Sequence, residues 1–168
     1  MSDVYLVLGS NIGEPMSQLR GAVSILSLIG DVKAVSSVYL SRPFGRRNQP
    51  NFYNQAVCLE TDATPQALLD FVKFAEPLLG REPRGQWLSR EIDMDIVLFD
   101  NLVIDTESLV IPHSGLYERD FFLKPITEIA PDMTEPLFGK RLSEMLSELE
   151  NKGETYIIKR LPSLWMIA

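Results

Sequence analysis

The stretch 90–99, REIDMDIVLF, decides both the fold and the candidate site of this chain. Side chains on a β-strand alternate between two faces, so Asp93 and Asp95 share a face that Val97 and Phe99 continue. The opposite face would carry Ile92, Met94, Ile96 and Leu98. The two acids lie roughly 6.5 Å apart at their Cα atoms and favour a cation between them. An acidic face in water is the commoner explanation of Asp-x-Asp, but it would also expose Val97 and Phe99. We therefore expect a largely covered strand with two acids at a site.

Length and composition indicate one globular domain over residues 1–168, with 45% hydrophobic and 23% charged residues. The net charge of −7 argues against nucleic-acid and membrane-surface partners, because both select basic surfaces. The single cysteine, Cys58, lies in an apolar run and is expected to be a buried hydrophobe. A signal peptide and a membrane-spanning run are both missing from the sequence, so we expect a cytoplasmic protein.

Apolar periodicity and breaker residues predict the elements around the acidic stretch. In chain order these are a strand at 4–8, a helix from Pro15 to Gly30, strands at 33–40 and 52–61, and a helix from Thr64 to Gly80 with a kink at Pro77. After the acidic strand come a turn at 100–103, a short helix at 125–130, an amphipathic segment at 142–149 and an edge strand at 156–159. This order fits an α+β fold with a ferredoxin-like βαββαβ core, a mostly antiparallel sheet and C-terminal additions.

Two loops carry positive charge. The first, 41–51, reads SRPFGRRNQPN and could be a mobile lid. The second, 80–90, has the glycine spacing of a phosphate-binding P-loop but lacks its lysine and serine or threonine, and it follows a helix. We exclude a P-loop. A flexible arm that brings arginines to phosphates fits better than a solvated charged loop, because the segment runs directly into Asp93.

Several single residues are candidates with two explanations each. Gly9 could let a ligand approach the backbone, although plain turn chemistry is favoured. Phe52 and Asn54 share a strand face that suits a flat heterocycle, and a core phenylalanine beside a turn asparagine explains them equally well. His113 is the only histidine, and a structural role is the commoner one for such a residue.

Four segments together resemble a known family, the 6-hydroxymethyl-7,8-dihydropterin pyrophosphokinases of folate biosynthesis. They are LVLGSN at 6–11, SRPFGRRNQPNFYNQAV at 41–57, WLSREIDMDIVLF at 87–99, and IPH at 111–113 with ERDFF at 118–122. The resemblance covers roughly residues 4–131. It implies transfer of diphosphate from ATP to the pterin hydroxymethyl group with release of AMP, on a ferredoxin-like fold.

The resemblance also implies roles for individual residues. Two Mg²⁺ ions would bind Asp93 and Asp95, which with Arg81 and Arg90 form the catalytic set. The pterin would lie among Gly9, Ser41, Phe44, Phe52, Asn54 and Phe121. ATP, the co-substrate, would contact Glu76, Trp87, Ile96, His113 and Arg119. The expected partners are these small molecules, without nucleic acid or membrane, and the expected state is a monomer.

One departure from the family pattern leaves alternatives open. The family commonly has Trp-Gly-Pro-Arg before its acidic strand, whereas Leu88 and Ser89 separate Trp87 from Arg90 here. Loss of a turn-forming glycine and proline can redirect Arg90. A catalytically weak relative that binds nucleotide or pterin as a sensor is therefore the second hypothesis, and a metal-dependent nucleotidyl transferase is the third.

Overall fold

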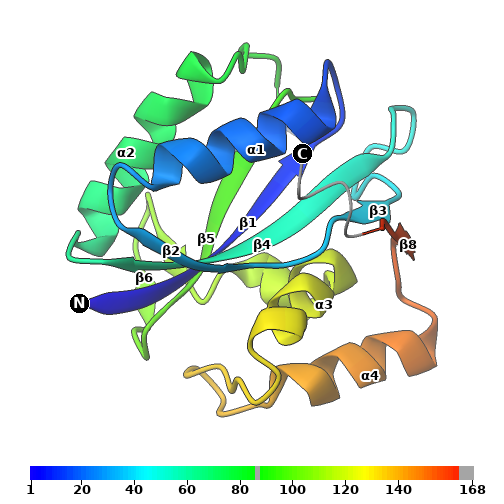
Figure 1. Ribbon diagram of the computed structural model, residues 1–168. Helices are drawn as coiled ribbons and strands as arrows, with labels where there is room; N and C mark the ends of the chain where they lie inside the picture. Colours follow the sequence, from blue (N-terminus) through cyan, green and yellow to red (C-terminus); the bar gives the residue numbers. More distant parts are fainter. Residues whose placement is uncertain (86–87, 163–168) are drawn as a thin grey trace.

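The computed structural model describes residues 1–85 and 88–162. Within them, a six-stranded antiparallel sheet runs through the molecule in the order β5-β1-β4-β3-β8, with β2 also paired to β4 (Figure 1). The strands are β1 (Ser2–Ser10), β2 (Asp31–Val35), β3 (Tyr39–Ser41), β4 (Phe52–Thr61), β5 (Asp93–Phe99) and β8 (Ile157–Arg160). The position of β5 at one end of this order, paired with β1, places the two acids next to the first strand.

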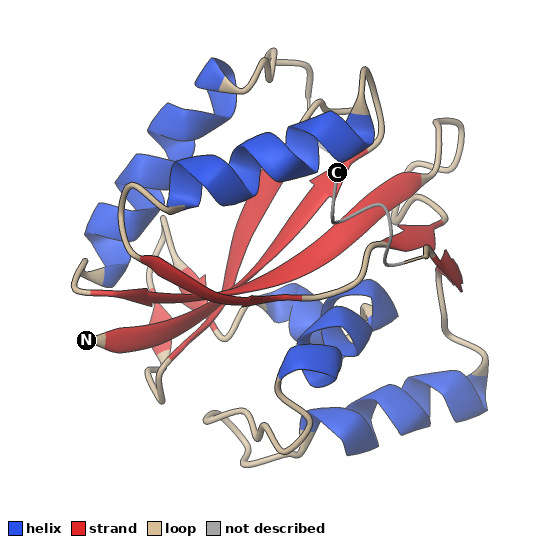
Figure 2. Cartoon of the chain, in the orientation of Figure 1, coloured by secondary structure: helices blue, strands red, loops and turns tan. Residues whose placement is uncertain are grey.

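Helices cover both faces of this sheet (Figure 2). One face packs against α1 (Pro15–Leu26) and α2 (Pro65–Leu78), and the other against α3 (Asp120–Ile129) and α4 (Leu142–Lys152). A small hairpin of β6 (Ile104–Asp105) and β7 (Val110–Ile111) and a 3₁₀ turn, η1 (Ser114–Tyr117), connect β5 to α3. The predicted ferredoxin-like core is confirmed by β1-α1-β2/β3-β4-α2-β5, and α3, α4 and β8 are the additions.

Local sequence signals account for the best-predicted elements. The Thr64 hydroxyl accepts a hydrogen bond from Ala67 N at 3.1 Å, and Pro65 occupies the first helical turn, so α2 begins where predicted. Pro77 is accommodated in its last turn, and Gly80 follows with φ +97. The prediction of a strand over 52–61 is confirmed, and Cys58 is buried as expected.

The predicted single strand over 33–40 is wrong, because the chain forms two strands there. Val35 pairs with Val57 and Tyr39 with Asn54, so this side of the ladder contains one extra residue. The Ser36 hydroxyl accepts a hydrogen bond from Ala56 N at 2.8 Å and so takes a backbone donor of β4 out of the regular ladder. A side chain that bonds in this way leaves no mark in hydrophobic periodicity.

The predicted alternation along the acidic strand holds only as far as Val97. Leu6 pairs with Ile96 but Tyr5 pairs with Leu98, so Val97 is the extra residue of a β-bulge. Beyond it the faces exchange. Phe99 packs with the α1 and α2 cluster, not on the acidic face as predicted, and Leu98 packs on the α3 side.

The segment after the acidic strand also differs from prediction. Helix α3 begins at Asp120 and not at Pro125, so Phe121 and Phe122 are helical and Pro125 lies inside the helix. An acid in the first turn favours a helix start through the helix dipole, and that signal precedes the proline. The amphipathic tail forms α4, which Gly153 ends in a left-handed conformation, and β8 confirms the edge strand. Across residues 1–85 and 88–162, none of the helices has the length and apolar character needed to cross a bilayer.

A buried carboxylate organises the connection between α3 and α4. Glu135 accepts hydrogen bonds from Leu137 N at 2.7 Å, Lys140 N at 3.0 Å and the Tyr117 hydroxyl at 2.9 Å. Burial opposes ionisation, but these donors together hold the pKa of Glu135 below its usual value. The carboxylate therefore stabilises the fold at pH values above the pKa it has in the unfolded chain.

Glu135→Ala is expected to lower the free energy of unfolding by roughly 2–4 kcal/mol at pH 7, because several buried donors lose their acceptor. The depressed pKa gives the sign of the pH dependence: this contribution is present above the unfolded pKa and is lost as the pH falls through the folded one. Urea unfolding of variant and wild type at pH 7 and pH 3 measures the loss of unfolding free energy and its dependence on pH. An equal difference between variant and wild type at the two pH values would contradict this role of the carboxylate.

Candidate active site

Two arginines from the loop before β5 meet Asp93. Arg81 Nη1 lies 3.1 Å from Asp93 Oδ1, and Arg90 Nη1 lies 2.9 Å from Asp93 Oδ2. The arm that sequence reasoning predicted to carry guanidinium groups toward phosphates is thus already folded over the first acid. Each carboxylate oxygen has its own cation, so both guanidinium groups are fixed at the open end of the acidic face.

The second acid faces the single histidine. His113 Nε2 lies 3.6 Å from Asp95 Oδ1, and His113 Nδ1 accepts a hydrogen bond from Gly115 N at 2.9 Å. An accepting Nδ1 in the neutral ring leaves the proton on Nε2, which points to the acid. His113 N also donates to the Val97 carbonyl at 3.0 Å. The bulged residue therefore helps to place the histidine beside Asp95.

The two acids have opposite pKa shifts. Burial, and after it the charge of Asp95, raises the pKa of Asp93 to about 7 against the effect of Arg90. Burial also acts on Asp95, but the His113 hydrogen bond and the nearby arginines hold its pKa below the usual range. Two negative charges side by side are thus unfavourable here, and a cation that bound at this place would stabilise the ionised pair.

Glu76 on α2 contacts both Arg81 and the backbone of β5 between the two acids. Its Oε2 accepts a hydrogen bond from Met94 N at 2.9 Å and lies 3.0 Å from Arg81 Nη1. Burial raises the pKa of Glu76. The side chain thereby fixes Arg81 and the backbone between the two acids, whereas its predicted contact with nucleotide stays a prediction.

Asn11 holds the backbone of Arg90. Arg90 N donates to Asn11 Oδ1 at 2.9 Å, and Asn11 N donates to the Arg90 carbonyl at 3.2 Å. Ser89 Oγ donates to Gln49 Oε1 at 3.2 Å, so the two positive loops touch. Leu88 and Ser89 therefore do not turn Arg90 away from Asp93. Sequence reasoning missed Asn11, although it stands in the quoted LVLGSN segment.

A cavity of about 70 Å³ adjoins the acids and has aromatic walls. It is lined by Val7, Gly9, Ser41, Arg42, Phe44, Phe52, Asn54, Arg90, Asp93, Asp95, Arg119, Phe121 and Phe122. Ligand pockets for small molecules usually exceed about 300 Å³, so the walls must separate to admit a substrate. Phe44 is the aromatic wall residue carried by a loop, and the mobile lid at 41–51 stays a prediction.

The floor of this cavity is formed by residues of β1, β3 and β4. Asn54 Nδ2 donates to the Tyr39 carbonyl at 3.0 Å and to Ser41 Oγ at 2.8 Å, which orients the side chain. Gly9 lies within β1 between Asn54 and Asp93, not in the turn that sequence reasoning favoured. A β-carbon at Gly9 would lie 3.7 Å from the Phe52 ring and 3.8 Å from Asn54 Oδ1. The glycine thus leaves room between them.

Arg119 joins the aromatic wall to the acids. Its guanidinium carbon lies 4.5 Å from the Phe44 ring centroid and 5.2 Å from that of Phe122. The Phe44 and Phe121 ring centroids are 6.3 Å apart. Loop, helix and strand residues that are distant in sequence therefore meet at one place.

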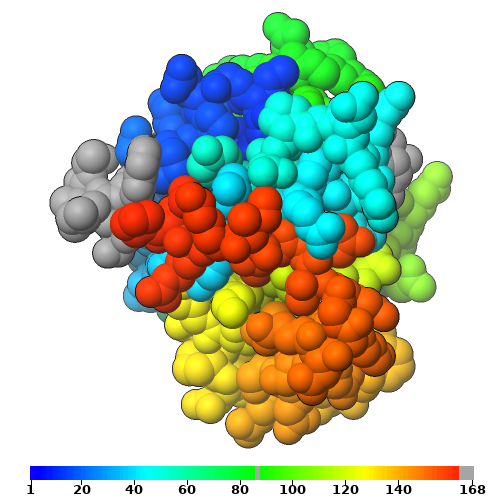
Figure 3. Space-filling model, turned by 90° about the vertical axis from the view of Figure 1, so that its right-hand side faces the viewer, coloured from blue at the N-terminus to red at the C-terminus, as the bar shows by residue number. Residues whose placement is uncertain are grey.

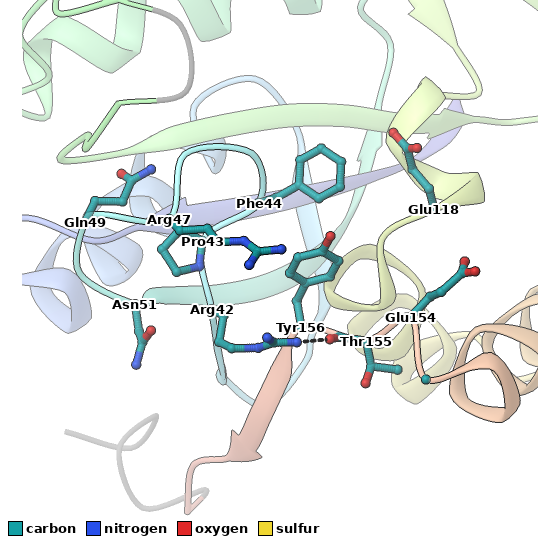
Figure 4. Close-up of a pocket in the computed structure, with 11 residues that line it drawn as sticks. Arg42, Pro43, Phe44, Arg47, Gln49, Asn51, Glu118, Glu154, Thr155 and Tyr156 are labelled. Atoms are coloured by element: carbon teal, nitrogen blue, oxygen red, sulfur yellow. Dashed lines mark hydrogen bonds between the residues drawn. The ribbon is translucent and has the colours of Figure 1, made fainter.

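One predicted nucleotide residue, Ile96, is not brought to this place, and a second, Trp87, lies outside the described residues. The Ile96 side chain is only 4% exposed and packs in the core with α1 and α2, on the face opposite the acids. On the outer side of Phe44 lies a second hollow of about 590 Å³, lined on opposite sides by Arg42 and Glu154 with Tyr156 between them (Figure 4).

The acids fit a magnesium site that is completed by the substrate. Over residues 1–85 and 88–162, the structure contains no cluster of three or more histidine, cysteine, aspartate or glutamate side chains suited to a metal. Mg²⁺ usually takes one or two carboxylates and fills its other positions with water and phosphate oxygens. Asp93 and Asp95 supply that number of ligands.

Comparison with known proteins identifies relatives along most of the chain. Residues 5–131 match the family model of 7,8-dihydro-6-hydroxymethylpterin-pyrophosphokinase (HPPK). The 2-amino-4-hydroxy-6-hydroxymethyldihydropteridine pyrophosphokinase of Aquifex aeolicus is 40% identical over 159 residues, which cover 95% of this chain and 99% of that protein. The Pseudomonas aeruginosa protein of the same name is 36% identical over 161 residues, with 95% and 96% coverage.

Solved structures agree on the fold. Wild-type HPPK-DHPS of Plasmodium falciparum, solved with pterin and p-hydroxybenzoate, matches with a TM-score of 0.71 at 14% identity. The match covers 90% of this chain and 44% of that one, so the chain spans less than half of the larger protein. At this identity the likeness establishes the fold alone.

Proposed function

The chain belongs to the 7,8-dihydro-6-hydroxymethylpterin-pyrophosphokinase family, and on this premise we propose how its site performs the reaction. The enzyme transfers diphosphate from ATP to the hydroxymethyl group of 6-hydroxymethyl-7,8-dihydropterin and releases AMP. One observation carries the proposal: the carboxylates and arginines around Asp93 open onto a cavity with aromatic walls and a polar floor. A flat heterocycle and a phosphate chain need these two surfaces side by side.

The aromatic cavity is the proposed pterin pocket. Phe52 and Phe121 line it from different elements and would stack on the two faces of the ring. Asn54 is oriented by its bonds to Tyr39 and Ser41, so its amide oxygen is left to bind the polar edge of the pterin. Phe44 would move with its loop to admit the ring.

The acids and arginines form the proposed phosphate side. Asp93 and Asp95 would hold two magnesium ions, which would supply charge neutralisation on the phosphates of ATP. Arg81 and Arg90 stand at the same carboxylate and can bind phosphate oxygens as paired donors once these arrive. His113 and Arg119 adjoin Asp95 and would contact the nucleotide.

Catalysis then depends on alignment and charge, since the pterin hydroxyl itself is the nucleophile. It attacks the β-phosphorus, the β-phosphorus bond to the α-phosphate oxygen breaks, and AMP leaves. Arginines aligned on the phosphates would lower the barrier because they stabilise the charge that develops there. Closure of the loops over the site would exclude water and limit hydrolysis of ATP.

Incubation of the protein with ATP, Mg²⁺ and 6-hydroxymethyl-7,8-dihydropterin tests the proposal. The expected result is AMP that forms only when the pterin is present. Binding of both ligands without AMP would instead support the catalytically weak relative, and release of pyrophosphate would support a nucleotidyl transferase. ADP as the product would contradict the mechanism. Reactions without pterin and without Mg²⁺ are the controls.

Phe121→Ala is expected to raise the KM for pterin about tenfold or more, through lost stacking of roughly 1 kcal/mol and lost burial. The KM for ATP should stay within about twofold, because Phe121 lines the aromatic end of the cavity. Steady-state kinetics with each substrate varied in turn measures both values. A variant that lost affinity for ATP alone would overturn the pocket assignment.

The proposal extends to the domain organisation, the oligomeric state, the partners, the location and the number of metal ions. Residues 1–168 are proposed to work as one domain and as a monomer, with small molecules as the only partners. A cytoplasmic location agrees with the sequence composition. The number of two metal ions comes from the family resemblance and is open to titration with Mg²⁺ in the presence of a non-hydrolysable ATP analogue.

A further inference from the structure

The segment just before β8 lies against the proposed pterin pocket. Gly153, with φ +71, ends α4 and turns the chain toward β3, where Ile157 pairs with Ser41 of the cavity. Figure 3 shows the red C-terminal residues between the cyan loop above them and the orange α4 below. A part of the chain outside the ferredoxin-like core thus reaches the wall of the site.

A buried acid fixes the backbone of this segment. The Asp120 carboxylate accepts hydrogen bonds from Tyr156 N and Ile157 N, both at 2.9 Å, and its residue is only 2% exposed. Asp120 directly precedes Phe121 on α3. The same carboxylate therefore links the position of Tyr156 to the helix turn that carries the proposed stacking residue.

The loop 42–51 forms hydrogen bonds with the segment just before β8. Arg42 N donates to the Tyr156 carbonyl at 2.8 Å, and the Arg42 side chain donates to the Thr155 carbonyl (Figure 4). The Arg42 guanidinium carbon lies 5.4 Å from the Tyr156 ring centroid. Tyr156 is thus held between the start of the lid loop and the first turn of α3.

The Tyr156 ring contacts two wall residues of the cavity, Phe44 on the loop 42–51 and Phe121 on α3. Its centroid is 5.3 Å from that of Phe44, with the rings inclined at 60°. It is 6.0 Å from the Phe121 centroid with a nearly perpendicular arrangement of 84°. Both distances lie in the range of favourable aromatic contacts. Tyr156 itself does not line the inner cavity but stands behind two residues that do.

We propose that Tyr156 is a positioning residue for pterin binding. It orients Phe121, and it packs against Phe44 when the loop 42–51 closes over the pocket. This inference rests on the proposed function of the cavity. It adds a role for the C-terminal segment, through contacts that lie wholly on the pterin side of the site. The phosphate side, at Arg81 and Asp93, has no part in these contacts.

Tyr156→Ala is expected to weaken pterin binding about tenfold, since two aromatic contacts behind the stacking ring are lost. The KM for ATP and the kcat at saturating pterin should stay within about twofold of wild type. Tyr156→Phe keeps the ring and should restore affinity. Ile158→Ala, an exposed neighbour on β8, is the matched control and should behave as wild type.

Fluorescence titration with 6-hydroxymethylpterin and steady-state kinetics give these values, and thermal unfolding checks each fold. If Tyr156→Ala does not fold, Tyr156→Leu, which keeps most of the volume, decides by the same criterion. The inference would be overturned if the folded variant bound pterin within twofold of wild type, or if it lost affinity for pterin and ATP equally. In either case, AMP formation by the wild type would still support the proposed function. A wild type that bound no pterin would overturn both.

Discussion

Asp95→Ala is expected to lower the rate of diphosphate transfer by at least about a thousandfold, because one of the two carboxylates that would hold Mg²⁺ is lost. The fold should survive. The charge of Asp95 is one of the causes that raise the pKa of Asp93, so its removal relieves repulsion within the pair. The loss of the His113 contact, which helps to hold the pKa of Asp95 low, opposes this relief, so the variant is expected to keep a cooperative thermal unfolding transition.

The measurement is pterin-dependent AMP formation at several Mg²⁺ concentrations, together with the thermal unfolding midpoint. Asp105→Ala is the matched control, because it removes an exposed carboxylate of β6 outside the cavity. Near-normal turnover of the Asp95 variant with an unchanged requirement for Mg²⁺ would show that the metal binds elsewhere. Loss of activity together with loss of the fold would be a structural effect, contrary to the expectation.

Arg90→Ala is expected to reduce kcat about a thousandfold, with a much smaller change in pterin affinity. An arginine that neutralises charge on a transferring phosphate contributes on the order of 10³-fold or more to such reactions. Arg90 is held ready for this task, since Asn11 fixes its backbone and Asp93 fixes its guanidinium group. Arg90→Lys should recover only part of the loss, because a lysine cannot donate two parallel hydrogen bonds.

Single-turnover measurements separate this effect from product release, and pterin titration tests the binding step. Arg141→Ala removes an exposed arginine at the start of α4 and serves as the control for net charge. A variant that kept its kcat and lost only pterin affinity would assign Arg90 to the aromatic pocket instead. Such a result would also indicate that Leu88 and Ser89 redirect Arg90 away from the phosphates.

Much of the fold was predictable because its signals are local. A capping threonine followed by proline marked α2, and the segment 52–61 with its apolar run at 56–59 marked β4, since each depends on a few neighbouring residues. The α3 boundary was missed, because Pro125 gave a stronger local signal than the acid that starts the helix. The two bulges were missed because pairing with a partner strand creates them.

In the candidate site, too, features set by local sequence were predictable and contacts between distant segments were not. Asp93 and Asp95 share a face through simple strand alternation, and the arginine loop is adjacent in sequence, so both were accessible to sequence reasoning. The roles of Asn11 and Tyr156 were not, because each acts through hydrogen bonds or ring contacts with segments far along the chain. Such contacts have no fixed spacing and leave no pattern to find.

The sequence by itself determined the acidic strand, the order of the core elements and the family resemblance, because alternation, capping and motif order are written along the chain. Tertiary structure alone decided which carboxylate meets which cation, that Val97 bulges so that His113 reaches Asp95, and that the C-terminal segment stands behind Phe121. These depend on distances between residues that are not neighbours in the sequence, and only the folded sheet and its helices fix those distances.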